Sequence, residues 1–326
     1  MRFSASEKYE IISLVHDSTV SVRMTLSQLE IPKSTFYDWC HRYQEEGFDG
    51  LQHKKYSDRR QWNQIPDSER EEVVKIALEE PEKSPRELAF HIIDKKDWFI
   101  SESSVYRILK SRGLITSPAW VVMKAADKFK DPPARVNELW QTDFSYFKIV
   151  HWGWYYLNTI IDDYSRYIIE WELCKNMRSD DVERIINKAL YTTRLGDNER
   201  PKLLSDNGSC YVSSDLHDFL TEKSITHVRG RPYHPQTQGK IERYHRTLKN
   251  VILLDHYLSP EQLRQRIGEF IVYYNNHRYH ESLNNLTPAD VYFGREREIL
   301  QQREIIKQRT ITKRRIDFEL SNTPLI

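Results

Sequence analysis

The chain has few cysteines, no long apolar run and almost no net charge. Its three cysteines, among 326 residues, are odd in number and widely spaced, so they suggest no disulfide framework and fit a reducing compartment. No segment approaches the roughly 20 apolar residues that a membrane span needs, and the first residues lack the apolar core of a secretory signal. We therefore expect a soluble, intracellular protein that resides in the cytoplasm and has no membrane partner.

A formal charge of +1 excludes a basic field over the whole protein, but the charge is unevenly distributed. Between Arg229 and Lys249 there are six basic residues and a single acid, Glu242. The last part of the chain, Arg295–Ile326, holds eight basic and five acidic residues. A basic stripe beside acidic residues fits an enzyme that binds both a polyanion and a metal ion.

The first 117 residues repeat one pattern, in which short helices are followed by a turn and a further helix. Apolar spacing predicts six helices, at Glu7–His16, Val22–Leu29, Ser34–Tyr43, Asp67–Glu79, Pro85–Ile93 and Ser101–Lys110. Ser84 and Glu87 have the spacing of a capping box at the start of the fifth helix. In the fourth helix we expect the apolar side chains from Val73 to Leu78 to be buried.

Each set of three helices is typical of a helix-turn-helix domain, whose last helix places its first turn against base edges. We thus predict DNA-binding domains at residues 1–60 and 61–117. The side chains expected to contact DNA are Lys33, Ser34, Thr35, Ser103, Ser104, Arg107 and Lys110. The alternative is a pair of ordinary three-helix bundles whose apolar faces serve only packing. The repetition favours DNA binding, because bundles made only for packing have no need to repeat the arrangement.

After a predicted linker at residues 118–136, the periodicity becomes strand-like over residues 137–258. The pattern predicts strands at Leu139–Val150, Trp154–Asp162, Arg166–Cys174, Lys202–Ser205 and Ile225–Val228, with helices at Asp180–Arg194 and Asp215–Lys223. This order is that of the ribonuclease-H-like α/β fold, a mixed sheet with helices on both faces. The overall fold class is therefore all-α modules followed by an α/β core, with a C-terminal helical extension and basic tail at residues 259–326. The tail could line DNA, join subunits or stay disordered.

Three acids stand at separate elements of this core. Asp143 lies in the first strand, Asp206 ends the fourth, and Glu242 opens a basic helix, with 35 residues between Asp206 and Glu242. Carboxylates delivered from separate elements suit a hard divalent cation, which takes oxygen ligands and leaves positions for water and phosphate. Two such ions activate the attacking oxygen and stabilise the leaving one in phosphoryl transfer. Singly, each acid would more often be a surface residue or a turn former.

The helix after Glu242 carries further basic residues at Arg243, Arg246 and Lys249, which we expect to contact the DNA backbone. A solvated charged face is the alternative. Tyr233, His234 and Gln236 precede the helix in a predicted loop that would shape access to the acids. His234 is not expected to bind metal, because such a site favours oxygen.

Two other polar groups admit two interpretations. Asp162 and Asp163 could bind metal, but their position before Tyr164-Ser-Arg favours a role in a turn. The stretch Tyr273-Tyr-Asn-Asn-His-Arg could contact DNA, and a buried face made by its tyrosines is at least as well supported.

Five stretches together resemble the DDE-type insertion-sequence transposases, whose catalytic core is of the retroviral-integrase superfamily. They are Trp140-Gln-Thr-Asp-Phe-Ser-Tyr, Ile161-Asp-Asp-Tyr-Ser-Arg-Tyr, Ser205-Asp-Asn-Gly, His234-Pro-Gln-Thr-Gln-Gly-Lys-Ile-Glu-Arg-Tyr-His-Arg-Thr-Leu-Lys and Tyr273-Tyr-Asn-Asn-His-Arg. The resemblance implies an integrase-type core in which Asp143, Asp206 and Glu242 are catalytic and bind two magnesium (or manganese) ions. In that family, water first cuts at the element's end, and the freed 3′-hydroxyl then attacks another phosphodiester.

The same resemblance implies further partners and one absence. The partners would be the terminal repeats of a mobile element, target DNA and further copies of the chain, in a bacterial cytoplasm and at the nucleoid when bound to DNA. Retroviral integrases carry a zinc module of paired histidines and cysteines. Only Cys40 precedes residue 174 here, so we expect no zinc of that type.

Three alternatives to a transposase stay open at this point. One is a nuclease of the same fold that hydrolyses without joining, although it would not need two front domains. Another is a DNA-binding regulator descended from a transposase, although all three acids are present. The third is an inactive structural partner in a transposition complex.

Overall fold

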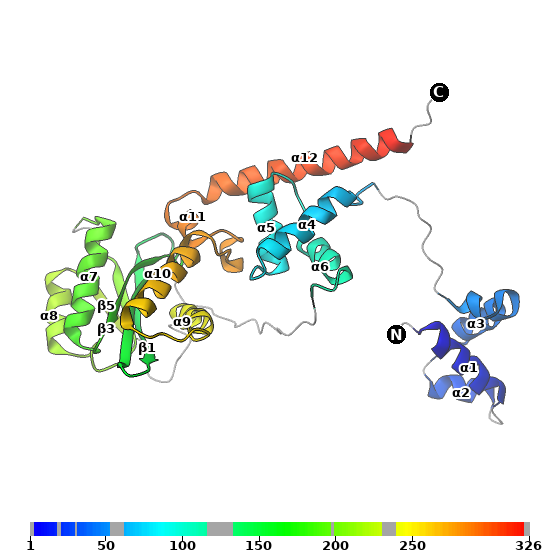
Figure 1. The fold of residues 1–326 in the computed structure, drawn as a ribbon, viewed down its shortest axis with the longest axis horizontal. Helices are drawn as coiled ribbons and strands as arrows, with labels where there is room; N and C mark the ends of the chain where they lie inside the picture. Colours follow the sequence, from blue (N-terminus) through cyan, green and yellow to red (C-terminus); the bar gives the residue numbers. More distant parts are fainter. Residues whose placement is uncertain are drawn as a thin grey trace. The chain divides into compact units, whose positions relative to one another are not determined.

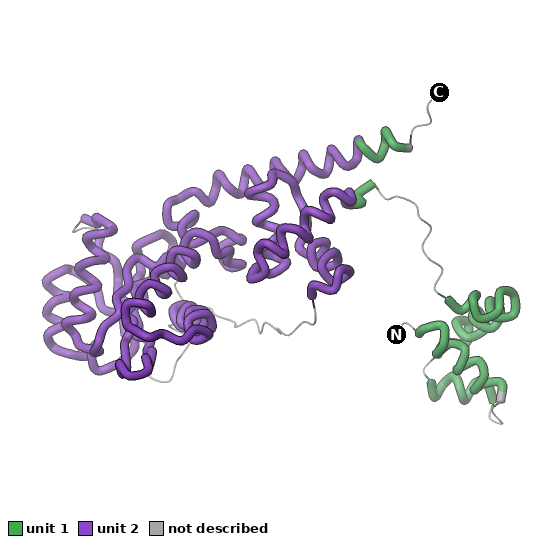
Figure 2. Tube along the Cα trace, in the orientation of Figure 1, with its two compact units in different colours: residues 1–64, 317–326 green, residues 65–316 purple. Residues whose placement is uncertain are grey.

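The computed structural model describes residues 3–17, 21–29, 31–52, 62–115, 133–196, 199–229 and 239–322. It divides into two compact units, residues 1–64 with 317–326 and residues 65–316 (Figure 2). Most of the predicted linker lies outside the described residues, as do Tyr233, His234 and Gln236. None of the described helices is long and apolar enough to cross a membrane.

The first unit contains the three helices that the sequence predicts at its front, each slightly longer or shorter than expected (Figure 1). They are α1 (Ala5–Asp17), α2 (Val22–Gln28) and α3 (Lys33–Glu46), followed by the 3-10 turn η1 (Gly47–Leu51). Leu26, Phe36 and Trp39 pack in their common core, and Lys8 Nζ donates to Leu51 O at 2.9 Å. A Cβ at Gly50 would lie 2.3 Å from the Arg42 carbonyl oxygen, so only glycine lets η1 fold back onto α3.

The second set of helices is α4 (Asp67–Glu79), α5 (Pro85–Lys96) and α6 (Glu102–Ser111). The predicted capping box of Ser84 and Glu87 is confirmed at the start of α5. This helix continues to Lys96, beyond the predicted Ile93, because basic residues in the last turn suit the negative end of the helix dipole. The expectation for Leu78 was wrong, since the other face of α4 packs inward and Leu78 is 64% exposed.

A five-stranded mixed sheet forms the centre of the second unit, in the order β3-β2-β1-β4-β5. The strands are β1 (Leu139–Ile149), β2 (Gly153–Asp162), β3 (Ile168–Cys174), β4 (Lys202–Ser205) and β5 (Thr226–Arg229). The first three form an antiparallel meander. β4 runs parallel to both β1 and β5, so the crossover helices lie on the sheet's faces. The α/β core with a mixed sheet is confirmed.

Helices cover both faces of this sheet and make two hydrophobic cores (Figure 1). On one face lie α7 (Ser179–Thr193) and α8 (Ser214–Glu222), which pack against Trp140 and Ile160. On the other lie α9 (Gly239–Ile252) and α10 (Pro260–Asn276), which pack against Phe147, Leu157 and Ile161. Burial on both faces explains why the strands are rich in large apolar residues.

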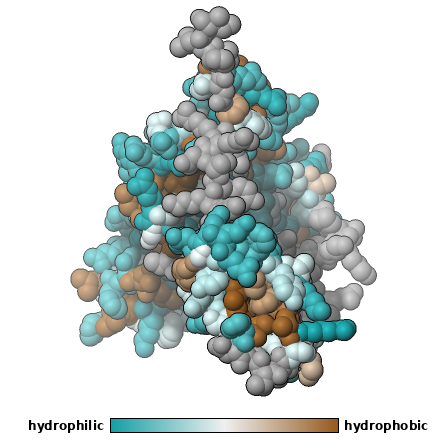
Figure 3. Space-filling model, turned by 90° about the vertical axis from the view of Figure 1, so that its right-hand side faces the viewer, coloured by the Kyte–Doolittle hydropathy of each residue, from teal (hydrophilic) through white to brown (hydrophobic). Residues whose placement is uncertain are grey.

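The C-terminal extension continues from α10 through η4 (Glu281–Leu283) and α11 (Pro288–Tyr292) into α12 (Glu296–Asn322). The predicted basic tail is therefore a helix of 27 residues, and disorder is wrong for this stretch. Arg303 of α12 binds both carboxylate oxygens of Asp94 on α5 at 2.8 Å, and Arg314 binds Glu69 on α4 at 2.6 Å. α12 thus joins the α4–α6 region within the second unit (Figure 1). On the face that Figure 3 shows, the described surface is mostly hydrophilic, with hydrophobic side chains in separate small patches.

Candidate active site

Asp143 lies on the side of β1 that faces α9. Its Oδ1 accepts a hydrogen bond from the backbone N–H of Phe144 at 2.8 Å, and its Oδ2 lies 3.3 Å from His245 Nδ1. The side chain keeps 23% of its surface exposed. Although Asp143 lies within a strand, its carboxylate is therefore open to solvent and to a ligand.

Asp206 directly follows β4, the parallel neighbour of β1. Gln141 is opposite Leu204, so two further residues along each strand bring Asp143 and Asp206 to the same end of the sheet. The Asp206 side chain is exposed, and its Oδ1 accepts a hydrogen bond from Gly208 N at 2.8 Å. A Cβ at Gly208 would lie 3.0 Å from that oxygen, so glycine leaves room for the carboxylate.

The segment after Asp206 folds back over β1. Tyr211 is buried, with its hydroxyl 3.4 Å from Thr142 Oγ1. Burial raises the pKa of Tyr211, and the charges of Asp143 and Asp206 add to the shift. Burial also raises the pKa of Cys210 to about 11, again with contributions from both aspartates. The two carboxylates therefore act on the same side chains. Because the thiol of Cys210 stays protonated at neutral pH, it is not expected to act as a thiolate.

α9 carries the third acid, Glu242, and presses its apolar side onto the sheet. Ile241, Tyr244 and Leu248 are all at most 1% exposed, whereas Glu242 is exposed. The backbone N–H of Ile241 donates to Gln141 Oε1 of β1 at 3.2 Å. Glu242 therefore begins the helix beside the strand that holds Asp143.

A buried polar network fixes the start of α9. Lys240 Nζ pairs with the carboxylate of Asp163, and Gln141 Nε2 donates to the same carboxylate at 2.5 Å. Arg166 donates to the backbone oxygen of Asp163. Burial lowers the pKa of Lys240, while the charge of Asp163 and its hydrogen bond oppose the shift. Lys240 and Asp163 are 77 residues apart, so no local pattern could have linked them.

Asp162 and Asp163 are 0% and 1% exposed and fully engaged with the protein. Asp162 accepts hydrogen bonds from Asn137 N at 2.7 Å, Ser165 N at 2.8 Å and Ser165 Oγ at 2.6 Å. Burial raises the pKa of Asp162, although these hydrogen bonds oppose the shift. The bonds to Ser165 close the turn between β2 and β3, which is the structural role that the sequence favoured.

The three predicted acids lie in one region of the core, but their carboxylates do not converge on a common point. Asp143 and Asp206 meet at one end of the sheet, and Glu242 lies three residues before His245, which contacts Asp143. Among the described residues, no group of three or more histidine, cysteine, aspartate or glutamate side chains is arranged to hold a metal ion. Two carboxylates are thus brought together, and the third stands on the helix next to them.

Sequence reasoning missed His245, which is 7% exposed and lies against Asp143. Its Nε2 is buried and has no hydrogen-bond partner among the described residues. The only available signal was its position one turn after Glu242, on the helical spacing of Ile241 and Leu248. That spacing more often marks a packing residue.

The predicted DNA-contacting residues of α9 lie on its outer surface. Arg243 and Arg246 are exposed, and Lys249 is half-buried. Lys249 Nζ lies 4.2 Å from the centroid of the Tyr146 ring on β1. The ammonium group of Lys249 thus lies beside the strand that carries Asp143.

The front modules also present their predicted residues to solvent. On α3, Lys33 and Ser34 are exposed and Thr35 is half-buried. On α6, Ser103, Arg107 and Lys110 are exposed, and Ser104 is half-buried. Ser101 is the residue that caps α6, because its side chain accepts from Ser104 N at 3.3 Å. Arg107 donates to Ser104 Oγ at 3.1 Å and is partly held along the helix.

For the stretch that begins at Tyr273, the sequence allowed either DNA contact or a buried face. Tyr274 is 3% exposed and belongs to the core between the sheet and α10. Asn275 is 5% exposed, and its side chain bonds both the N–H and the C=O of Ile168 at 2.9 and 3.0 Å. These two residues serve packing and hold β3, so the buried-face interpretation is confirmed for them.

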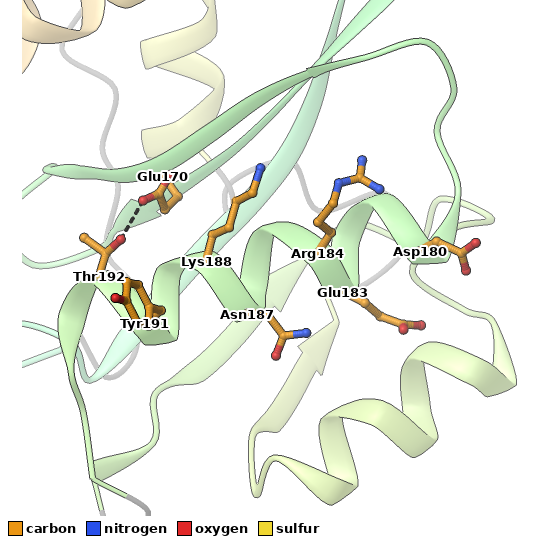
Figure 4. A pocket seen from close by; sticks show the side chains of 8 residues that line it. All are labelled: Glu170, Asp180, Glu183, Arg184, Asn187, Lys188, Tyr191 and Thr192. Carbon is orange, nitrogen blue, oxygen red and sulfur yellow. Dashed lines mark hydrogen bonds between the residues drawn. The ribbon is translucent and has the colours of Figure 1, made fainter.

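A separate charged hollow follows α7 beside β3 (Figure 4). Glu170, Asp180, Glu183, Arg184, Asn187, Lys188, Tyr191 and Thr192 line it. Its two basic side chains are paired locally, since Arg184 and Lys188 both bind Glu172, and Thr192 donates to Glu170. None of the three predicted acids contributes to its wall.

The described fold, helical modules followed by an α/β core with a mixed sheet, can be compared with known families. Two models, each described as "Integrase core domain", match residues 133–235 and 223–288. A model described as "Helix-turn-helix domain" matches residues 7–60, and one described as "Homeodomain-like domain" matches residues 35–109. The chain therefore combines helix-turn-helix domains with an integrase core.

Its relatives include transposases of bacterial mobile elements. A candidate transposase, InsK, for insertion sequence element IS150 of Escherichia coli K12 is 29% identical over 157 residues, which are 48% of this chain and 54% of that protein. The transposase for transposon Tn552 of Staphylococcus aureus is 25% identical over 280 residues, which are 77% of this chain and 57% of that protein. The chain thus spans little more than half the length of either. The resemblance to insertion-sequence transposases with an integrase-superfamily core is confirmed.

Solved structures show a weaker likeness. The HTLV-2 integrase catalytic core domain, solved in complex with magnesium, has a TM-score of 0.40 and 22% sequence identity. It covers 49% of this chain and 98% of its own.

Proposed function

We propose that this protein is a transposase that cuts DNA at the ends of a mobile element and joins those ends to target DNA. The observation that carries the proposal is the parallel pairing of β1 with β4, which brings Asp143 and Asp206 to one end of the sheet beside α9. The kinship with integrase cores and transposases supports the same activity.

Asp143, Asp206 and Glu242 are proposed as the catalytic residues and as the ligands of magnesium or manganese ions. All three supply hard oxygen donors, and Asp206 and Glu242 are exposed, which suits hydrated divalent cations. When bound, the ions would activate the attacking oxygen and stabilise the leaving one. Because Glu242 is exposed at the start of α9, its carboxylate would be available as a further oxygen ligand.

The chain's own residues would position the DNA for two displacements. In the first, a water oxygen bonds to the scissile phosphorus, and the departing 3′-oxygen takes a proton to become a hydroxyl. In the second, that hydroxyl oxygen bonds to a phosphorus of target DNA, whose own 3′-oxygen leaves. Arg243, Arg246 and Lys249 would hold the flanking phosphates, which positions the reacting groups and offsets their charge.

End recognition is proposed for the two front domains, residues 1–60 and 61–117, with the catalytic core at residues 137–258. Most of their predicted contacts on α3 and α6 are exposed, and Thr35 and Ser104 are half-buried. α12 packs on α4 and α5 through Arg303 and Arg314 and leaves Ser103, Arg107 and Lys110 of α6 exposed. Joining two ends in one reaction requires two DNA-bound copies, so we also propose an oligomer on DNA.

The test is a strand-transfer assay with DNA that carries the element's own terminal sequence. Full-length protein and the Asp206→Asn variant would each be incubated with that DNA in magnesium and in EDTA. DNA binding of both proteins would be measured in parallel without metal. We expect joined products only with magnesium and only with the unaltered protein, at similar DNA binding.

Other outcomes would replace the proposal. Cleaved ends without joined products would indicate a hydrolytic nuclease of the same fold. Tight end binding without any product would indicate a DNA-binding regulator or a chain that needs another subunit. Joined products from Asp206→Asn would remove this aspartate from the catalytic set.

A further inference from the structure

The β1–β2 hairpin exposes two aromatic rings near the candidate active site. Tyr146 is 57% exposed and Trp154 is 51% exposed. Their ring centroids are 5.7 Å apart, with the planes at 69°. Single exposed aromatic residues are ordinary on a protein surface, but two in contact form a continuous apolar patch that needs an explanation.

Each of these rings has a lysine beside it. Lys249 Nζ lies 4.2 Å from the Tyr146 ring centroid, and Lys148 Nζ lies 5.8 Å from that of Trp154. We call these four side chains the aromatic-lysine surface. Rings combined with cations are the composition that binds single-stranded nucleic acid, because bases stack on the rings while lysines meet phosphates.

The composition of the hairpin points to the same ligand. From Phe144 to Ile161 the chain has seven aromatic residues and no aspartate or glutamate, although the whole protein has 48 acids. A docking partner of ordinary protein composition would not require this exclusion of acids. A polyanion does, because each carboxylate on the surface would repel its phosphates.

The aromatic-lysine surface also lies where DNA would pass. Tyr146 follows Asp143 by three residues on β1, about 10 Å along the strand, and its side chain leaves the opposite face of that strand. Lys249 follows Glu242 on α9 and reaches the same ring. The pairing of β1 with β4 is confined to Leu139–Gln141, so β4 does not cover β1 beyond Asp143.

We propose that Tyr146 and Trp154 stack on unpaired bases of the DNA end whose phosphates Lys148 and Lys249 contact. The ligand is a single-stranded or frayed stretch of DNA next to the scissile phosphate. Paired bases are already stacked in the duplex and would gain less from the rings. This inference rests on the proposed DNA-end function, and it assigns to the hairpin the opened part of that end.

The test measures DNA binding without metal, so its result does not depend on cleavage or joining. The full-length protein would be titrated with three fluorescein-labelled probes: a fully paired terminal duplex, the same duplex with its last base pairs mismatched, and oligothymidine. We expect Trp154→Leu to weaken binding of the mismatched duplex and of oligothymidine by about 5- to 100-fold, the range measured for loss of one stacked base. Binding of the paired duplex should change by no more than about twofold.

Two further variants separate stacking from other effects. Trp154→Phe keeps a ring and should bind the opened probes nearly as well as the unaltered protein. Trp152→Leu is the matched control, because Trp152 is 54% exposed in the same hairpin but bonds Leu258 O at 3.0 Å. It should leave binding of all three probes unchanged.

Three results would overturn the proposal. One is equal binding of the opened probes by Trp154→Leu and the unaltered protein. Another is an equal loss on paired and unpaired probes, which would indicate a purely electrostatic surface. The third is unchanged DNA binding with altered sedimentation of Trp154→Leu, which would indicate a contact with another protein copy.

If Trp154→Leu fails to fold, fluorescence of the folded proteins still decides the question. The difference between the unaltered protein and Trp154→Phe isolates the emission of Trp154. Oligothymidine should quench this emission if the indole stacks on a base, and undiminished emission would contradict stacking.

Discussion

Two pairs of carboxylates in the same core have opposite surroundings. Asp162 and Asp163, at the end of β2, are at most 1% exposed and bonded to Asn137, Ser165, Gln141 and Lys240. Asp143, within β1, and Asp206, directly after the neighbouring strand β4, keep contact with solvent. The first pair uses its oxygen lone pairs on the protein, whereas the second retains lone pairs for a ligand.

The role of an acid, in folding or in chemistry, can therefore be assigned from its hydrogen-bond and ion-pair partners. A buried carboxylate must be paired and hydrogen-bonded, because an unpaired buried charge is costly. Such an acid therefore contributes to folding. An acid with few protein partners at the end of a strand contributes little to folding and is available for chemistry.

The largest expected effect tests the second half of this comparison. Glu242→Gln should reduce cleavage and joining by about a thousandfold or more, roughly 4 kcal/mol of transition-state stabilisation, because the neutral amide is a poor ligand for a hard cation. End binding and the unfolding midpoint should hardly change, since Glu242 is exposed. Product formation on gels, filter binding and thermal unfolding would be measured on one preparation. A loss of binding as large as the loss of cleavage would contradict the division between front domains and core.

The next largest effect tests the role of the buried pair, Asp162 and Asp163, in folding. Asp163→Ala leaves Lys240, whose side chain is 19% exposed, without its partner, and should lower the free energy of unfolding by about 3–5 kcal/mol. Urea unfolding measures this change. Asp206→Ala is the control, because its exposed side chain should cost less than about 1 kcal/mol. A similar loss of unfolding free energy in the two variants would contradict the distinction between buried and exposed acids.

The same rule extends to α12, whose ion pairs with the α4–α6 region include buried and exposed ones. Arg303→Ala removes a side chain that is 8% exposed and binds Asp94 twice, so we expect a cost of about 2–3 kcal/mol. Arg309→Ala removes a side chain that is 55% exposed and pairs with Asp97, so it should cost no more than about 1 kcal/mol. Amide hydrogen exchange along α12 would show the difference. Equal exchange rates in the two variants would contradict it.

The pH dependence of stability gives a further test, through His280. Burial, with repulsion from Arg278 and Arg166, lowers the pKa of His280 to about 3. The unfolded chain therefore takes up this proton first as the pH falls below about 6.5, and stability should fall by about 1.4 kcal/mol per pH unit. This contribution is complete above pH 6.5 and is lost toward the folded-state pKa. His280→Phe should flatten the slope, and urea unfolding at pH 7 and pH 5 would reveal a slope that does not change.

The smallest expected effect concerns Lys249 beside the acids. Lys249→Ala should weaken end binding a few-fold and reduce the slope of log affinity against log salt by about one, because one phosphate contact releases about one counterion. Lys307→Ala is a control, since that exposed lysine pairs with Glu304 on α12. An unchanged salt slope for Lys249→Ala would support a solvated charged face.

Much of the core followed from local patterns in the sequence. The β-rich runs over residues 139–174 predicted three strands, and the limits of β4 were predicted correctly from a short buried apolar run. Helix ends were less accurate. α5 extends past the predicted Ile93 to Lys96, and α12 occupies the basic tail, for which the sequence predicted no helix bounds.

The order of elements, the helix-turn-helix pattern at the front and the three acids on separate elements could all be predicted from the sequence. Periodicity and turn chemistry act between residues that are close along the chain, so they are readable there. Only the tertiary structure decided that β4 lies beside β1, that His245 meets Asp143, and that Lys240 pairs with Asp163. Lys240 and Asp163 are 77 positions apart along the chain, and His245 and Asp143 are 102 positions apart. These contacts depend on which surfaces bury each other, and no local pattern contains that information.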